Sequence, residues 1–249
     1  MKKILSILAM AAMIFTVACN KDNKPHHHGG DDEGDDYEAP IVIDGDLSDW
    51  AQLDAAKVAS CSLKNADGWA YPDIKSAQVY ADPFFIYVCM LFNDLEPDAT
   101  LTYNATIFLN GDNDTATGGY NFWGNAWDQG DKPCLDVMVS ASFFAENAWI
   151  TDTINEWEVC TWGGEDNADD WGWEEAATPG FVTAKAIVNK GIEIAIRRDL
   201  YPAGKIADQF TVGFMLQGGS DPIGILPNEE VSETNEKGLA PLLVVNTNK

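Results

Sequence analysis

The sequence predicts an all-β fold, namely an antiparallel β-sandwich of jelly-roll-like architecture built as a single domain. From Ile41 onward, short apolar segments rich in Val, Ile, Phe and Tyr alternate with turn-forming Gly, Asp, Asn and Pro. Many short strands separated by turn residues are typical of sandwiches and barrels. No segment has the 3.6-residue apolar period of a long amphipathic helix. The roughly 210 residues after Ala39 also suit one large β domain.

Nine segments have the composition of strands. The alternation is clearest in Ile192–Ile196, where the three isoleucines face one way. Asp82-Pro83 and Asn189-Lys190-Gly191 are expected to turn the chain between neighbouring strands. A short helical turn is expected at Arg198–Pro202. The expected strands are Ser76–Ala81, Phe84–Asn93, Ala105–Leu109, Leu135–Phe143, Glu156–Thr161, Phe181–Asn189, Gly191–Ile196, Phe210–Gln217 and Leu242–Val245.

A leader and a linker precede the domain. Lys2-Lys3 stand before an apolar run that is shorter than the roughly 20 residues of a membrane-spanning helix, so residues 1–18 are predicted to be a secretory signal. A small residue directly before Cys19 resembles the lipobox of bacterial lipoproteins, which implies lipidation of Cys19 and anchoring in the cell envelope, on an outer membrane. The alternative is an unlipidated cysteine near a plain cleavage site. Residues 19–39, acidic and rich in Gly, are expected to form a flexible tether, and residues 40–249 the folded domain.

Charge and composition exclude several functions. The formal net charge of −25 repels polyanions, so nucleic acid is not an expected partner. This acidity suits a protein that binds neutral sugars or divalent cations. All three histidines lie in the tether, at His26–His28, which excludes histidine-dependent catalysis and histidine-rich metal sites in the domain. Four domain cysteines allow three pairings, among which the sequence does not choose: Cys61, Cys89, Cys134 and Cys160.

Four motifs follow one another in a recognisable order. They are I-V-I-D-G-D-L-S-D-W from Ile41, F-I-Y-V-C-M-L-F-N-D from Phe85, L-N-G-D-N-D with T-G-G-Y from Leu109, and G-I-E-I-A-I-R-R from Gly191. Together they resemble the family 9 carbohydrate-binding modules and their DOMON-like relatives, over residues 41–227. The resemblance implies a sandwich that holds a sugar between tryptophans. Trp50 is expected to be structural, filling one end of the sandwich core.

The acidic loop after Leu109 is a candidate calcium site, with side-chain oxygens two residues apart at Asn110, Asp112 and Asp114. Calcium takes six to eight oxygens, so further ligands are needed. The candidates for these are Asp128, Asp131 and Asp136. The resemblance favours calcium, whereas the alternative is a solvated turn in which Asp and Asn bond backbone amides.

Tryptophans crowd into loops rich in Gly, Asn and Asp between residues 120 and 175. Indole faces stack on the C–H faces of pyranose rings while neighbouring polar side chains bind hydroxyls, so this composition favours a sugar site. The expected sugar-binding residues are Trp123, Trp127, Trp162, Trp171 and Trp173. The alternative is that they cover the end of the core. Trp157 alternates with Val159 and is expected to be buried.

The leading hypothesis is a lipid-anchored, non-catalytic protein that binds a glycan or oligosaccharide, alongside other glycan-uptake proteins. One alternative is a surface adhesion module that lacks a sugar pocket. A second is weak glycoside hydrolase activity, which needs two carboxylates. Nothing in the sequence singles out a pair among Glu156, Glu158, Asp170, Glu174 and Glu175. Haem is not expected, because its axial ligands would have to be methionines in expected strands, namely Met90, Met138 or Met215.

Overall fold

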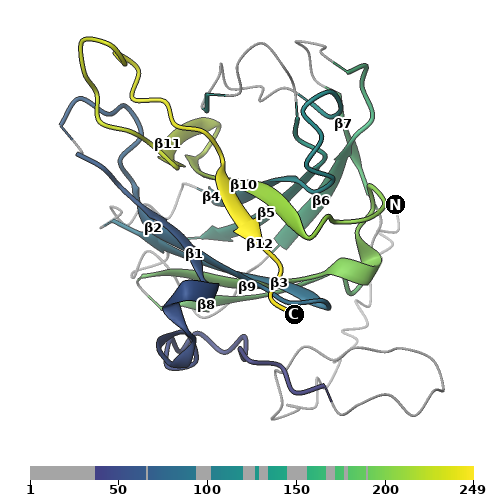
Figure 1. Cartoon of the computed structure of the whole chain (residues 1–249). Coiled ribbons are helices and arrows are strands. Elements are labelled where there is room, and N and C mark those ends of the chain that lie inside the picture. Colours follow the sequence, from purple (N-terminus) through teal and green to yellow (C-terminus); the bar gives the residue numbers. More distant parts are fainter. Residues whose placement is uncertain are drawn as a thin grey trace, which may run out of the picture.

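Two antiparallel sheets packed face to face form the framework of the protein in the computed structural model (Figure 1). The structure describes residues 37–65, 67–93, 102–119, 127–128, 134–144, 156–166, 172–176, 179–188 and 190–249. The predicted all-β sandwich is confirmed. The predicted signal, Cys19 and the tether up to residue 36 lie outside these ranges. Within them, no helix has the length and apolar character needed to span a bilayer.

Sheet A has the strand order β1-β2-β3-β9-β8, and sheet B the order β11-β10-β4-β5-β6-β7, with β12 also paired to β10. The strands of sheet A are β1 (Ala59–Ser62), β2 (Ile74–Ala81), β3 (Phe85–Phe92), β8 (Val182–Ile187) and β9 (Gly191–Arg197). Those of sheet B are β4 (Thr102–Asn110), β5 (Val137–Phe144), β6 (Glu156–Trp162), β7 (Trp173–Glu175), β10 (Gln209–Gly218), β11 (Asp221–Leu226) and β12 (Leu243–Asn246). Three 3-10 turns complete the fold: η1 (Trp50–Gln52), η2 (Ala55–Lys57) and η3 (Arg198–Leu200).

Alternation along the strands divides the buried apolar side chains into three layers. Strand β4 shows the division, because Ile107 and Leu109 face the core between the sheets whereas Phe108 faces the opposite side. One further layer covers the outside of sheet A and includes Ile41 and Ile43 of the N-terminal segment. The other covers the outside of sheet B and draws on several loops.

The N-terminal segment packs on sheet A from its first described residue. The hydroxyl of Tyr37 donates a hydrogen bond to Asp82 at 2.6 Å, and Ala39 is buried, so the last residues assigned to the tether belong to the fold. Asp82 also accepts from the backbone amides of Phe84 and Phe85, both at 2.8 Å. This cap closes the β2–β3 hairpin that Asp82-Pro83 predicted.

A buried carboxylate fixes the same segment farther along. Trp50 is 7% exposed and lies on the outside of sheet A, not at the end of the core as expected. Its Nε1 donates to Glu193 at 2.7 Å, and the amide of Gly45 donates to the other carboxylate oxygen at 2.8 Å. Burial raises the pKa of Glu193 to about 7. The first and last of the four sequence motifs are therefore joined by one side chain.

The strand register decides which cysteines share a layer. Cys61 packs against the core between the sheets, and Cys89 lies in the layer outside sheet A. Cys134 and Cys160 both lie in the layer outside sheet B. No disulfide joins these four described cysteines. Of the pairings that the sequence left open, only Cys134 with Cys160 would stay within one layer.

Candidate functional site

The outer face of sheet B, meaning the side chains of β4–β7 and β10 that point away from the core, gathers most of the residues predicted to be functional. Its first two cross-strand rows are polar on β4 and β5, whereas on β10 the second row holds the buried Met215. Ser142 donates a hydrogen bond to Asn104 beside it, and the hydroxyls of Thr106 and Ser140 lie 2.9 Å apart. Together with Gln217, which pairs with Asn104, we call these five residues the polar rows. All five carry neutral hydroxyl or amide groups.

The next row on this face is apolar and is covered by the tryptophan layer, which we define as Trp69, Trp127, Trp162 and Trp173 with the strand residues beneath them. Trp127 is 1% exposed and meets Phe108 edge-on, with ring centroids 5.5 Å apart. Its Nε1 donates to the carbonyl of Leu226 at 2.9 Å. A Cβ at Gly213 would come within 2.7 Å of the Trp127 ring, so this glycine makes room for the indole. In this structure Trp127 has no face open to a sugar.

Trp162 lies in a slot formed by glycines. A Cβ at Gly119 would approach its ring to 2.1 Å, and Gly164 and Gly172 contact it in the same way. Its ring meets Trp173 edge-on at 5.6 Å between centroids. Trp173 is 6% exposed, whereas Trp162 remains partly exposed. Of the predicted tryptophans that the structure describes, Trp162 is thus the one with accessible surface, while Trp123 and Trp171 lie outside the described residues.

Three indole N–H groups in this layer are buried and have no hydrogen-bond partner within the described part of the chain, those of Trp69, Trp162 and Trp173. Unpaired buried donors are rare in folded proteins. The sequence reasoning missed Trp69, which comes from the loop between β1 and β2 and packs edge-on against Tyr71. Trp157, expected in the core, is 38% exposed, so that prediction is wrong. It does share the inward side of β6 with Val159, but it stands near the start of the strand.

The acidic loop begins where β4 ends. Asn110 is the last residue of β4, and Asp136 lies opposite it, just before β5. Asp136 accepts from the amide of Gly111 at 2.7 Å. Burial, followed by the negative charge of Asp112, raises the pKa of Asp136 to about 6. Asn110 is 2% exposed, and its Oδ1 has no hydrogen-bond partner in the described structure.

The other loop oxygens are engaged in turns. Asp112 accepts from the amide of Asp114 at 2.8 Å and from the hydroxyl of Thr117 at 3.1 Å, and Asp114 accepts from the amide of Ala116 at 2.8 Å. This is the Asx-type turn expected in the absence of a cation. No group of three or more His, Cys, Asp or Glu side chains is arranged for a metal in the described ranges. Asp128, the fourth predicted ligand, follows Trp127 and donates its amide to the carbonyl of Ala240.

The other residues singled out by sequence occupy varied positions. Glu158, Glu174 and Glu175 are exposed on strands, whereas the side chain of Glu156 and all of Asp170 lie outside the described residues. Met90 is buried in the core between the sheets, and Met138 and Met215 are buried in the layer outside sheet B. These methionines are packing residues.

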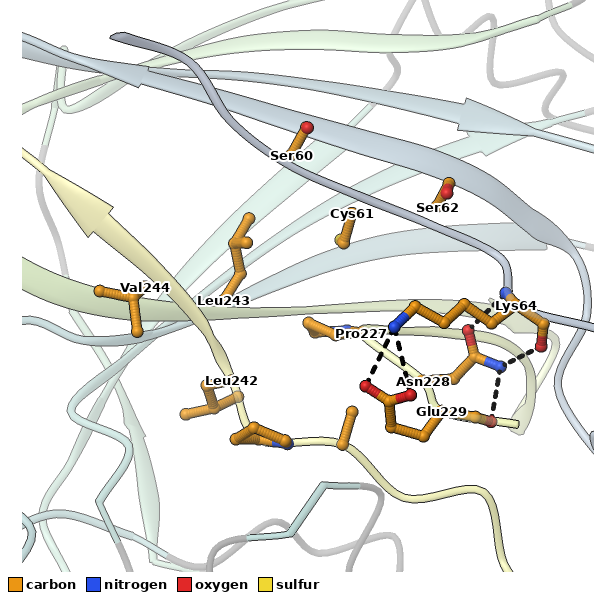
Figure 2. A pocket seen from close by; sticks show the side chains of 12 residues that line it. Ser60, Cys61, Ser62, Lys64, Pro227, Asn228, Glu229, Leu242, Leu243 and Val244 are labelled. Atoms are coloured by element: carbon orange, nitrogen blue, oxygen red, sulfur yellow. Dashed lines mark hydrogen bonds and ion pairs between the residues drawn. The ribbon is translucent and has the colours of Figure 1, made fainter. Parts of the chain in front are cut away.

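A separate cavity of about 290 Å³ lies between the edge strands β1 and β12 (Figure 2). The side chain of Asn228 braces one end by bonding the backbone N–H and C=O of Lys64, whose Nζ lies 3.0 Å from Glu229 (Figure 2). Its described lining includes no aromatic side chain and none of the predicted site residues. The outer face of sheet B is therefore the better candidate site.

The fold and this face define an all-β sandwich protein that carries a tryptophan-rich layer on the outside of one sheet. Comparison with protein-family models, with curated proteins and with solved structures gave no match. The resemblance to family 9 carbohydrate-binding modules and DOMON-like domains therefore rests on the four sequence motifs.

Proposed function

We propose that this protein binds carbohydrate without catalysis and that the glycan occupies the outer face of sheet B. The observation that carries the proposal is the set of unpaired indole N–H groups of Trp69, Trp162 and Trp173. A buried donor left without an acceptor costs about 1–3 kcal/mol. These N–H groups are closed off in this structure, so sugar hydroxyls would supply acceptors by moving the side chains of the layer apart on binding. The partly exposed Trp162 would offer an apolar surface to a pyranose ring.

The polar rows support the same proposal. Hydroxyl and amide side chains both donate and accept hydrogen bonds, as sugar hydroxyls do. Glycan binding then combines polar contacts on β4 and β5 with stacking on β6. The lipobox-like motif at Cys19 supports attachment of the protein to the cell envelope, where other glycan-uptake proteins would act on the same ligand.

Titration of the full chain with a panel of neutral oligosaccharides, followed by tryptophan fluorescence and calorimetry, tests the proposal. We expect Trp162→Ala to abolish binding. The matched control is Trp157→Ala, which removes an indole from the same strand but on its other face. Because loss of Trp162 could loosen the layer, the double variant Asn104→Ala/Ser142→Ala provides a second test on the polar rows. A panel without a single binder would favour the adhesion module instead.

We propose calcium as a stabiliser of the acidic loop, supported by the buried, unpaired Oδ1 of Asn110 opposite the carboxylate of Asp136. A cation there would use the oxygen of Asn110 and would favour the ionised form of Asp136. Calcium at about 100 times its Kd would add about 2.7 kcal/mol to the free energy of unfolding. Melting curves with calcium and with chelator should differ for the wild type and coincide for Asp136→Asn. Asp46→Asn, an exposed change in the N-terminal segment that packs outside sheet A, should keep the calcium effect.

A further inference from the structure

Positive charge is distributed unequally between the two sheets. The strands of sheet A carry Lys75, Lys185 and Arg197, one each on β2, β8 and β9. The described strands of sheet B, from β4 to β7 and from β10 to β12, contain neither Lys nor Arg. No strand residue of the proposed glycan site can therefore neutralise an acidic ligand.

Two carboxylates border this site at the β6–β7 edge. Glu158 pairs with Ser140 of the polar rows, and Glu175 pairs with Cys160, so both point to the outer face of sheet B. Both are exposed, while the thiol of Cys160 between them is buried and hydrogen-bonds to Glu158. Trp173, with its unpaired N–H, is two residues from Glu175 on the same side of β7.

We infer that the glycan bound by this face carries no carboxylate, sulfate or phosphate groups, and that Glu158 and Glu175 determine this specificity. The inference rests on the proposed function and adds the class of ligand to it. A glycan that runs from Trp162 along β6 would pass Glu175, beside Cys160, and then Glu158, about 13 Å from Trp162 along the strand. An acidic substituent would meet two like charges with no Lys or Arg on the strands of sheet B, within a protein whose net charge is −25. Neutral hydroxyls would instead find hydrogen-bond acceptors in the same carboxylates.

Pairs of polymers that differ mainly in charge test the inference: dextran with dextran sulfate, hydroxyethyl cellulose with carboxymethyl cellulose, and galactan with a sulfated galactan. For whichever backbone binds, we expect the acidic member to bind at least about tenfold more weakly at low salt, with the gap narrowing at high salt because exposed charges are screened. Equal or tighter binding of the acidic member would overturn the inference and leave carbohydrate binding intact. If neither member of any pair binds, the proposed function fails and the inference fails with it.

A charge-neutralising variant tests the two residues. Glu158→Gln/Glu175→Gln should raise the affinity for the acidic polymer severalfold and leave the affinity for its neutral partner nearly unchanged. Glu174→Gln is the matched control, because Glu174 is the neighbour of Glu175 but pairs with Thr161 on the other face of the sheet. An unchanged ratio of acidic to neutral affinity in the double variant, or an equal change in the control, would overturn the role of Glu158 and Glu175.

Discussion

Replacing Glu193 with glutamine should change how the stability of the fold depends on pH. Glu193 is fully buried and accepts hydrogen bonds from Trp50 and Gly45 at 2.7 and 2.8 Å. Burial is the main reason that its pKa rises to about 7, the two hydrogen bonds oppose the rise, and the charge of Asp44 adds to it. The cross-strand neighbours on the same face are Cys89 and Lys185. The site thus holds a carboxyl group that keeps its proton until near neutral pH.

The sign and size of the effect follow from the two states of this carboxyl group. In the unfolded chain it titrates near 4.5, so between pH 4.5 and 7 the folded protein of the wild type retains a proton that the unfolded chain releases. The contribution of Glu193 to stability is therefore fully present below pH 4.5 and is lost as the pH rises through about 7. At about 1.4 kcal/mol per pH unit, this loss amounts to about 2–3 kcal/mol between pH 5 and 8.

Urea denaturation of the wild type and Glu193→Gln at pH 5 and pH 8 measures this difference. The glutamine cannot ionise, so its free energy of unfolding should fall by about 2–3 kcal/mol less than that of the wild type between the two pH values. The variant should also be less stable at pH 5, by about 1–2 kcal/mol, because the N–H₂ of its side-chain amide would face either the indole N–H of Trp50 or the backbone N–H of Gly45 and cannot accept from it. The pKa of Asp136 is also raised, to about 6, but Asp136 titrates in both proteins, so its contribution cancels in the comparison. Identical pH dependence in the two proteins would refute this account of Glu193.

Three further outcomes are expected. Gly213→Ala should lower the free energy of unfolding by about 1–3 kcal/mol, because the new methyl group would meet the ring of Trp127 at 2.7 Å. In the same urea titration Gly218→Ala should lower it less, because its methyl group would lie 3.3 Å from a flexible side chain. Adding a reducing agent should leave the melting temperature unchanged, since no disulfide joins the four domain cysteines; a drop of several degrees would contradict this. Asp82→Ala should lower the free energy of unfolding by about 1–3 kcal/mol, because it removes the cap of the β2–β3 turn and the acceptor of Tyr37. Melting curves that overlay those of the wild type would argue against such a cap.

The sequence was most informative where strands alternate clearly. All nine expected strands are present, because each combines β-branched or aromatic residues with turn residues at its ends. Three strands were not expected. β1 reads A-S-C-S, β7 has three residues, and β11 contains Pro222 and Gly224, all of which look like loop in sequence. Each is short or lies at an edge, where tertiary pairing outweighs local preference.

The candidate site was less predictable, because composition locates tryptophans in loops but not the partners that bury them. Trp127 is covered through Gly213, more than 80 residues away in sequence, and Trp162 contacts Gly119. No local sequence pattern predicts such contacts. The polar rows did leave a signal: Asn104 and Thr106 alternate with core residues in one strand, as Ser140 and Ser142 do in the next. Polar residues at every second position of adjoining strands indicate a sheet face that is not packed with apolar side chains alone.

The tryptophans themselves supply an internal comparison that bears on function. Two of them are held by acceptors within the fold: Trp50 donates to Glu193 and Trp127 to the carbonyl of Leu226. Trp50 lies outside sheet A, whereas Trp127 lies in the tryptophan layer itself. Among the described residues, the three buried indole N–H groups that have no partner belong to the same layer as Trp127, next to the polar rows. Because Trp127 lies in the same layer and is paired, burial in this layer does not by itself leave an indole N–H without an acceptor, a lack that costs about 1–3 kcal/mol. Under the proposed function, a glycan would bring the acceptors that the described residues do not supply to these three indoles.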